Sequence, residues 1–196
     1  PGGTRIAVKV PRFLSMEIDE VGAIRYAIQP LNRNAAISFE PYLDGGITNE
    51  DTNWDDPFWE VTSVESEGAR AYIGAHTLKT HFDTCTFMHA VLERDGKAVD
   101  GDRQEVRGEK RIGHRYTADA EKGQELVLYK FGGYAADLNH PKGSLRKAAD
   151  KALDQALSLG FDGLKKAQQD AWARIWEMSD ITIEGDVRAQ QGIRFN

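Results

Sequence analysis

Cysteine is almost absent from this chain of 196 residues, which contains a single one, Cys85. One cysteine cannot form an internal disulfide, so no disulfide framework supports the fold. Cys85 lies in a segment that reads as a strand, where we expect a small buried apolar residue rather than a catalytic thiol. The absence of disulfides fits a reducing compartment, and we expect a cytoplasmic protein.

An excess of positive charge is also lacking. The chain has 25 Lys and Arg against 31 Asp and Glu, which gives a formal net charge of −6 at pH 7. Binding to nucleic acid requires clustered cations that neutralise phosphates, and binding to an anionic membrane surface requires the same. The basic residues here are scattered, so the sequence argues against both kinds of partner.

Long apolar runs are missing too. No stretch approaches the length of a membrane-spanning helix, and no charged-then-apolar signal segment opens the chain. Hydrophobic residues nevertheless make up 40% of the sequence, which is enough to build a core at this length. The first residue is proline rather than methionine, so we expect the natural chain to begin earlier.

The residues from 1 to about 140 have the pattern of an all-β domain. Ile6, Val8 and Val10 alternate with polar or small residues, as in a strand with one buried face. Glycine-containing turns, such as Asp44-Gly45-Gly46 and Asp95-Gly96, separate the apolar segments. Further strands are predicted over residues 24–28, 37–39, 59–64, 69–75, 84–92, 111–118 and 125–131. Many short strands without intervening helices predict a mainly β fold, a large antiparallel β-sandwich, followed by an α-helical linker.

The period changes after residue 140. Ser144 is predicted to cap a helix that ends at Gly160, and Asp162 to cap a second helix that runs to about Met178. The second helix carries Trp172 and Trp176 four residues apart, which predicts that they stack on a neighbouring apolar stripe. That stripe belongs either to the sandwich or to a structure outside this chain.

The final segment predicts a third helix, capped by Asp186. It reaches Asn196 without a glycine or proline stop signal at its end and without a completed apolar stripe, so we expect the chain to be truncated there. We therefore divide the sequence into a sandwich domain (1–140), a helical linker (141–180) and the start of a further domain (181–196).

The segment from Tyr42 to Trp59 contains the densest group of polar and aromatic residues. Asp51, Asn53 and Asp55 match the beginning of an EF-hand calcium loop. Asp56 then occupies the position of the required glycine, and Thr62 that of the bidentate glutamate, which argues against calcium. The five histidines show no metal-ligand spacing, so no metal site is predicted.

Two interpretations of this segment remain. Aromatic faces beside carboxylates and amides are typical of sugar-binding sites. The same residues also form side-chain-to-backbone turns that anchor a loop on a sandwich. Glu50 and Asp51 are the best internal pair of carboxylates for glycoside cleavage, although pairs are always found among so many acidic residues. The candidate residues for a substrate-binding or barrel-facing loop are Asn49, Asp51, Asn53, Trp54, Asp55 and Trp59.

Several motifs, taken together and in order, resemble the N-terminal domain and linker of glycoside hydrolase family 65, the maltose, trehalose and kojibiose phosphorylase group. They are Arg12-Phe13-Leu14-Ser15-Met16, Gly22-Ala23-Ile24-Arg25-Tyr26, Tyr42-Leu43-Asp44-Gly45, Asn49-Glu50-Asp51-x-Asn53-Trp54-Asp55-x-x-Phe58-Trp59, Ala171-Trp172-Ala173-Arg174-Ile175-Trp176, Asp180-Ile181-x-Ile183-Glu184-Gly185-Asp186 and Gln190-Gln191-x-Ile193-Arg194-Phe195-Asn196.

The resemblance implies an accessory domain in front of a catalytic helical barrel, of which residues 181–196 would be the start. The intact enzyme would cleave an α-linked disaccharide by inverting phosphorolysis and release a glucose 1-phosphate. Phosphate would be its co-substrate, with no metal or organic cofactor. Its catalytic motifs are absent here, so no catalytic residue is carried over to this chain. The barrel, the disaccharide and a second copy in a homodimer are the expected partners. The alternatives are a free-standing carbohydrate-binding β-sandwich and the same domain on a trehalase-like hydrolase.

Overall fold

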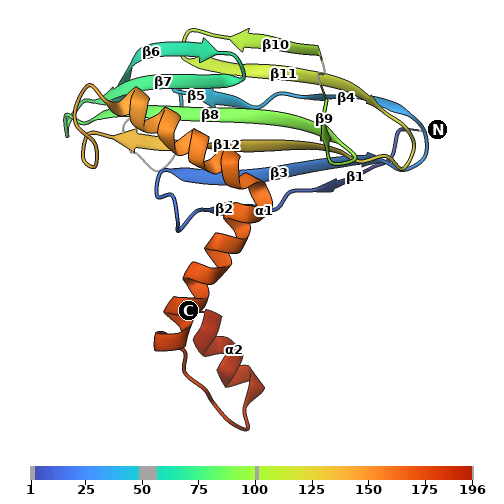
Figure 1. The fold of residues 1–196 in the computed structure, drawn as a ribbon, viewed down its shortest axis with the longest axis vertical. Coiled ribbons are helices and arrows are strands. Elements are labelled where there is room, and N and C mark those ends of the chain that lie inside the picture. Colours follow the sequence, from blue (N-terminus) through green and yellow to red (C-terminus); the bar gives the residue numbers. More distant parts are fainter. Residues whose placement is uncertain (1–2, 49–56, 100–101, 196) are drawn as a thin grey trace.

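Two antiparallel β-sheets and a long helix dominate the structure (Figure 1). The computed structural model describes residues 3–48, 57–99 and 102–195. The large sheet contains eight strands: β1 (Ile6–Lys9), β2 (Arg12–Leu14), β3 (Val21–Pro30), β6 (Trp59–Glu67), β7 (Arg70–Thr77), β8 (Asp83–Arg94), β9 (Lys97–Ala98) and β12 (Leu126–Ala136). The small sheet contains four: β4 (Ala35–Phe39), β5 (Tyr42–Asp44), β10 (Asp102–Arg107) and β11 (Arg111–Ala120). The predicted sandwich followed by helices is confirmed.

The two faces of the large sheet are buried by different layers. On β8, Met88 and Leu92 belong to clusters that pack against the small sheet, and we name this side the sandwich face. Cys85 and Phe87 point to the opposite side, named the helix face, and belong to a cluster that includes the following helix. The strand thus buries both sets of alternating side chains, and Cys85 is buried as the sequence predicts.

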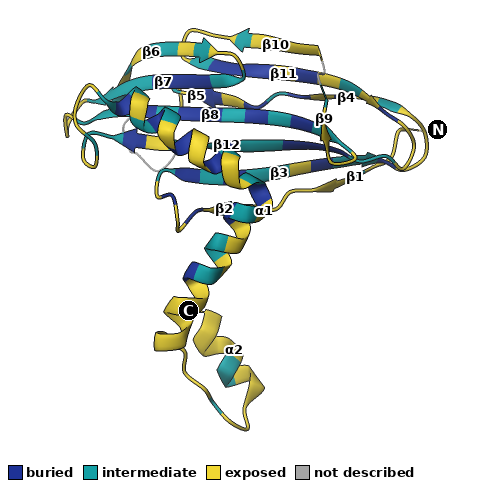
Figure 2. Cartoon of the chain, in the orientation of Figure 1, coloured by how far each residue is buried: buried dark blue, intermediate teal, exposed yellow. Residues whose placement is uncertain are grey.

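Helix α1 (Leu145–Ser179) begins directly on the helix face, where it crosses the large sheet (Figure 1). Leu145, Ala149, Leu153 and Ala156 recur at helical spacing, and all are buried. Figure 2 shows these buried positions along one side of the helix and exposed positions along the other. The first half of α1 is therefore packed against the large sheet along its apolar side.

A polar seam beside this apolar stripe also joins α1 to the sheet. Asp150 accepts hydrogen bonds from the Tyr72 hydroxyl at 2.5 Å and from the Arg70 guanidinium at 3.1 Å. Arg146 lies over the Tyr72 ring at 3.3 Å from its centroid and donates to Glu65 at 2.7 Å. Burial alone would raise the pKa of Asp150, but hydrogen bonds from Tyr72 and Arg70 outweigh it and lower the pKa. Asp150 is thus an ionised carboxylate held at the helix–sheet contact.

A sharp bend at Gly160 divides α1 into two helical segments. Gly160 has φ 67° and ψ 178°, a conformation open almost only to glycine. Phe161 follows, and its ring contacts Phe13 at 5.3 Å and Tyr129 at 5.7 Å between centroids. The predicted break at Gly160 is confirmed, but the predicted cap at Asp162 is wrong. The second segment resumes at once after Gly160, so Asp162 lies inside the helix.

The other two predicted caps have different outcomes. Ser144 occupies the N-cap position of α1, but its hydroxyl donates to the Pro141 carbonyl and makes no capping bond. Asp186 does cap α2 (Val187–Phe195), because its Oδ1 accepts the backbone N–H groups of Arg188 at 2.9 Å and Ala189 at 3.0 Å.

Beyond its middle, α1 leaves the sheet and projects away from the sandwich together with α2 (Figure 1). Leu164 is still buried, whereas Trp172 and Trp176 are 41% and 42% exposed. The two tryptophans therefore do not cover the sandwich. Within the described residues, no helix is both long and apolar enough to cross a membrane.

Candidate functional site

The segment that carries the predicted loop runs from one sheet to the other, and its two ends are bonded to each other. We name this contact between Gly45 and Trp59 the closed neck. The segment leaves β5 of the small sheet and enters β6 of the large sheet. The indole N–H of Trp59, the first residue of β6, donates to the Gly45 carbonyl at 2.9 Å. The Gly46 N–H donates to the Asp44 carboxylate at 2.8 Å and turns the chain just after β5. The two ends of this segment are therefore fixed next to each other.

Only one residue of the predicted loop site can be placed. Asn49, Asp51, Asn53, Trp54 and Asp55 lie outside the described residues, as does Glu50, and their role stays a prediction. Trp59 is half-buried and uses its N–H for Gly45. Its position fits the anchoring interpretation, in which an aromatic side chain holds the base of the loop.

A polar cluster lies beside this neck, because β6 pairs with β7 and Trp59 faces Thr77. Asp83 lies opposite His76 on the neighbouring strand. Its carboxylate is hydrogen-bonded to Nδ1 of His76 at 2.7 Å and accepts a hydrogen bond from the Lys142 ammonium at 2.8 Å. The hydrogen bond from Lys142, followed by that from His76, lowers the pKa of Asp83. An ionised carboxylate therefore connects the β7–β8 turn to the start of the helical region.

His81 completes this cluster from the β7–β8 turn. Its Nδ1 lies 3.4 Å from Nε2 of His76, and its backbone has a left-handed φ of 58°, which is uncommon for a residue with a side chain. Across residues 3–48, 57–99 and 102–195, no three His, Cys, Asp or Glu side chains are grouped to hold a metal ion. The sequence pairs His76 with His81 but does not reveal Asp83, whose contact depends on the register of β7 and β8. The short turn between the end of β7 at Thr77 and the start of β8 at Asp83 is the feature of the sequence that indicates this contact.

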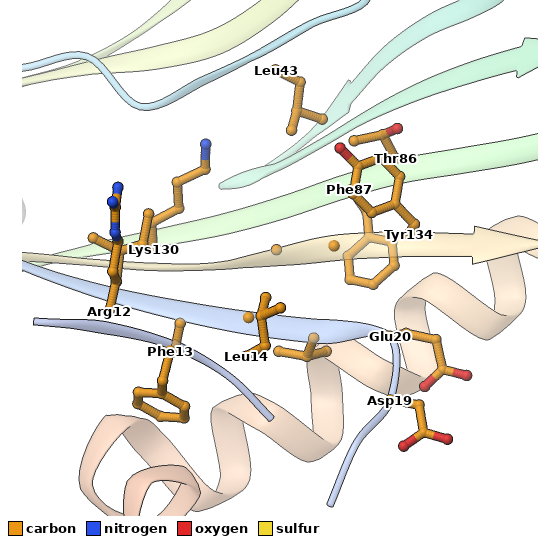
Figure 3. A pocket seen from close by; sticks show the side chains of 16 residues that line it. Arg12, Phe13, Leu14, Asp19, Glu20, Leu43, Thr86, Phe87, Lys130 and Tyr134 are labelled. Atoms are coloured by element: carbon orange, nitrogen blue, oxygen red, sulfur yellow. The ribbon is translucent and has the colours of Figure 1, made fainter. Parts of the chain in front are cut away.

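A hollow of about 610 Å³ opens on the sandwich face, where β2, β3 and β12 extend past the small sheet (Figure 3). Gly22 and Gly132 are part of its lining and have no side chains to fill it. Arg12 and Lys130 line one wall, and Tyr134 lines the other. Lys130 donates to the Tyr42 carbonyl at 2.8 Å, and burial lowers its pKa. The hollow is thus mostly apolar, with the cations of Arg12 and Lys130 on one side and the carboxylates of Asp19 and Glu20 also in its lining.

The projecting half of α1 carries a second unusual surface. Trp172, Ile175 and Trp176 lie on one side of the helix, and each is more than a third exposed. Met178 follows and is 88% exposed. We name these four residues the linker stripe. A contiguous apolar surface of this kind is typical of an interaction site.

Known proteins are similar to this chain in sequence and in fold. The sequence pattern that defines "glycosyl hydrolase family 65, N-terminal domain" matches residues 1–175. This chain belongs to glycosyl hydrolase family 65. The match covers all twelve strands and most of α1, so the family assignment concerns the sandwich and its attached helix together.

Individual family 65 relatives agree with the assignment. The chain is 30% identical to an alpha,alpha-trehalose phosphorylase of Thermoanaerobacter brockii, covering 100% of this chain and 26% of that protein. It is 29% identical to a maltose phosphorylase of Bacillus subtilis (strain 168), covering 97% and 25% respectively. A solved structure described as a candidate kojibiose phosphorylase from the human microbiome superposes with a TM-score of 0.85 at 22% identity, over 100% of this chain and 25% of that one. This family 65 chain thus spans about a quarter of the length of its relatives.

Proposed function

We propose that this chain is the N-terminal accessory domain of an enzyme that cleaves α-linked disaccharides of glucose by inverting phosphorolysis. The supporting observation is the family 65 match over residues 1–175, together with relatives that are named maltose and trehalose phosphorylases. In inverting phosphorolysis an acid protonates the glycosidic oxygen while phosphate attacks the opposite face of the sugar, which yields a glucose 1-phosphate. Inorganic phosphate is the co-substrate, no metal or organic cofactor takes part, and the enzyme works in the cytoplasm.

The division of labour that we propose assigns residues 1–140 to the sandwich, 141–180 to the linker and 181–196 to the start of a helical catalytic barrel. The chain contributes no catalytic residue. The linker stripe supports a barrel as its partner, because its two tryptophans are 41% and 42% exposed and present a large apolar area. A homodimer of the whole enzyme remains part of the proposal.

The segment from Asn49 to Trp59 is proposed to face the substrate or the barrel. Its closed neck supports this placement, because the Trp59–Gly45 hydrogen bond fixes the base of the segment. The same end of the sandwich carries the cluster of His76, Asp83 and Lys142. An element mounted on such a base can extend toward a neighbouring domain without loosening the sheets.

The activity is tested by comparing residues 1–196 with the full-length gene product. Each protein is incubated with phosphate and maltose, trehalose or kojibiose, and glucose 1-phosphate is measured. We expect product from the full-length protein alone. Free glucose formed without phosphate would instead identify a trehalase-like hydrolase, and product from residues 1–196, with contaminating enzyme excluded, would refute the proposed division of labour.

The role of the linker stripe is tested by complementation. A separately produced barrel fragment is expected to regain activity when residues 1–196 are added. Trp172→Ala with Trp176→Ala should reduce this recovery about tenfold or more, since buried tryptophans are typical hot spots of interfaces. Glu177→Ala, on the opposite side of the same helix, is the matched control and should recover fully. Equal recovery by all variants would contradict docking through the linker stripe.

A free-standing sugar-binding sandwich makes a different prediction. The isolated chain would then bind a disaccharide, and Trp54→Ala would abolish the binding. Isothermal titration of residues 1–196 with maltose and trehalose distinguishes this function from that of an accessory domain, for which we expect no measurable binding.

A further inference from the structure

Two histidine rings meet head-on at the end of the sandwich that carries the closed neck. His76 lies on β7, and His81 lies in the turn between β7 and β8, which Figure 1 shows at the end of the sandwich where α1 begins. Nδ1 of His81 is 3.4 Å from Nε2 of His76, and the two ring centroids are 5.7 Å apart. The centroid separation exceeds the nitrogen separation by about two ring radii, so the two nitrogens point straight at each other.

Asp83 determines which nitrogen of His76 carries a proton. The Asp83 carboxylate is bonded to Nδ1 of His76 at 2.7 Å, and it is ionised because hydrogen bonds from Lys142 and then from His76 lower its pKa. Neutral His76 therefore has its proton on Nδ1 and a lone pair on Nε2. His81 donates to this lone pair from its own Nδ1. A line of hydrogen bonds thus runs from the turn through His76 to Asp83 and Lys142.

The turn that this line reaches also holds one side of the closed neck. His81 has a left-handed φ of 58°, a conformation that a residue with a side chain adopts only when its surroundings hold it there. The Leu78 N–H of the same turn donates to the Phe58 carbonyl at 2.9 Å, and Thr77 pairs with Trp59. The contact between the two rings therefore helps to hold the backbone on which the base of the loop segment is anchored.

The pair of rings accommodates one added proton but not two. When one ring is protonated, it donates to the lone pair of the other, so the hydrogen bond persists. When both rings are protonated, both facing nitrogens carry a hydrogen, and two positive charges lie on rings whose nitrogens are 3.4 Å apart. The second proton therefore replaces a hydrogen bond by repulsion.

The charged groups around the pair offset one added charge better than two. Asp83 on β8 faces the pair directly, and Glu60 on β6 is the register partner of the ring on β7. Lys142, before α1, is bonded to Asp83 at 2.8 Å, and its pKa is raised by Asp83 and, to a smaller extent, by Asp137. Lys79 belongs to the same turn as the second ring. Since Asp83 is shared with the Lys142 ammonium, a second cationic ring is poorly compensated.

We propose that His76 and His81 form an acid-sensitive latch on the turn between β7 and β8. The latch is closed while His81 donates to His76. Histidine is the side chain that ordinarily changes its charge between about pH 5 and pH 8, so acidification brings both rings to the charged state and opens the latch. The open turn binds more protons than the closed turn, so the closed state loses stability as the pH falls. Opening releases the contact of Leu78 with Phe58 and loosens the closed neck.

Hydrogen–deuterium exchange of the full-length gene product measures the state of the latch. Observed exchange rates of peptides that cover residues 77–82 are compared with the intrinsic rates of unstructured peptides at the same pH, at about pH 7.5 and about pH 5. We expect the protection of the turn to fall about tenfold or more between these two pH values. No sugar or phosphate is present, so the result does not depend on the proposed phosphorolysis. Unchanged protection of the turn would overturn the proposal.

Two substitutions show whether the pair of rings causes this loss. His81→Asn removes one imidazole, and asparagine is among the residues that accept a left-handed backbone. In this variant the protection of the turn should change less than about threefold over the same pH range. His140→Gln is the matched control, because His140 is also bonded to a carboxylate, that of Glu20 at 2.9 Å, but is not paired with another histidine among the described residues. The control should keep the pH response of the parent protein. A full response in His81→Asn, or its loss in His140→Gln, would refute the latch.

Discussion

Replacing Gly160 by alanine is expected to destabilise this protein, although the same change inside a regular helix is stabilising by about 1 kcal/mol. The reason is the backbone of Gly160, whose φ of 67° and ψ of 178° lie in a region that alanine rarely enters. No other atom would obstruct the new methyl group, since nothing lies within 4 Å of its position. The cost therefore comes from the backbone alone, which makes this substitution a clean test.

The magnitude follows from two alternative responses. If the bend persists, alanine is held in a strained conformation at a cost of about 1–3 kcal/mol. If the bend straightens instead, Phe161 is drawn away from Phe13 and Tyr129, and aromatic contacts of this kind contribute about 0.5–1.5 kcal/mol each. Either response lowers the free energy of unfolding by about 1–3 kcal/mol.

Urea unfolding monitored by tryptophan fluorescence measures this change, with Gly163→Ala as the control. Gly163 lies in the second segment of α1 without a positive φ, and its new methyl group would meet only the side chain of Leu159, at 3.3 Å. The control should therefore change the free energy of unfolding by no more than about 1 kcal/mol, with a gain in helix propensity offsetting the close contact. If Gly160→Ala proved as stable as the parent protein, the bend could not be an enforced feature of the native state.

Three further predictions concern titrating and reactive groups. Asp150→Asn should lower the free energy of unfolding by about 1–2 kcal/mol in urea titrations, since hydrogen bonds from Tyr72 and Arg70 to a charged acceptor are lost. The pKa of Asp150 in the folded protein lies below its unfolded value of about 3.9. The stabilisation by the ionised carboxylate should therefore be fully present above about pH 3.9 and disappear as the pH falls through the folded pKa. Burial raises the pKa of the Cys85 thiol to about 11, so Ellman's reagent at pH 8 should label it at the rate of global or local unfolding, and immediate labelling of folded protein would contradict a buried thiol. Burial, followed by the charge of Arg70, lowers the pKa of His89 to about 4, so the NMR chemical shifts of its ring should stay constant from pH 8 to about pH 5. The free energy of unfolding should fall as the pH drops from about 6.5 toward 4, because only the unfolded chain takes up a proton at His89 in that range.

The sequence predicts the strands well where their side chains alternate. The segment predicted over residues 84–92 is β8, and the hairpin predicted at Asp95-Gly96 joins β8 to β9 with positive φ at both residues. Pro41 lies between β4 and β5, and its carbonyl accepts the N–H of His114. β10 is not predicted from the sequence, because most of its side chains are exposed and polar and show no alternation of apolar and polar residues.

The candidate site could be predicted only in part, because its contacts depend on pairing between distant strands. The sequence places Trp59 in an aromatic segment but does not reveal that its N–H is bonded to Gly45. The cluster of His76 and Asp83 follows from strand register, which single-sequence periodicity does not fix. The hollow around Lys130 arises from the unequal width of two sheets, a property of topology rather than of any motif.

The length of the second segment of α1 determines both how far from the sandwich and in which direction the linker stripe lies. Each residue of an α-helix advances its axis by 1.5 Å and turns it by about 100°. Deleting one residue between Leu164 and Ala171 would therefore leave the sandwich intact, yet rotate Trp172 and Trp176 to a different side of the helix. Chimeras that join this sandwich to another domain through α1 should therefore keep the residue count from Gly160 to Trp176, or change it by whole heptads, which keep the linker stripe close to its original direction.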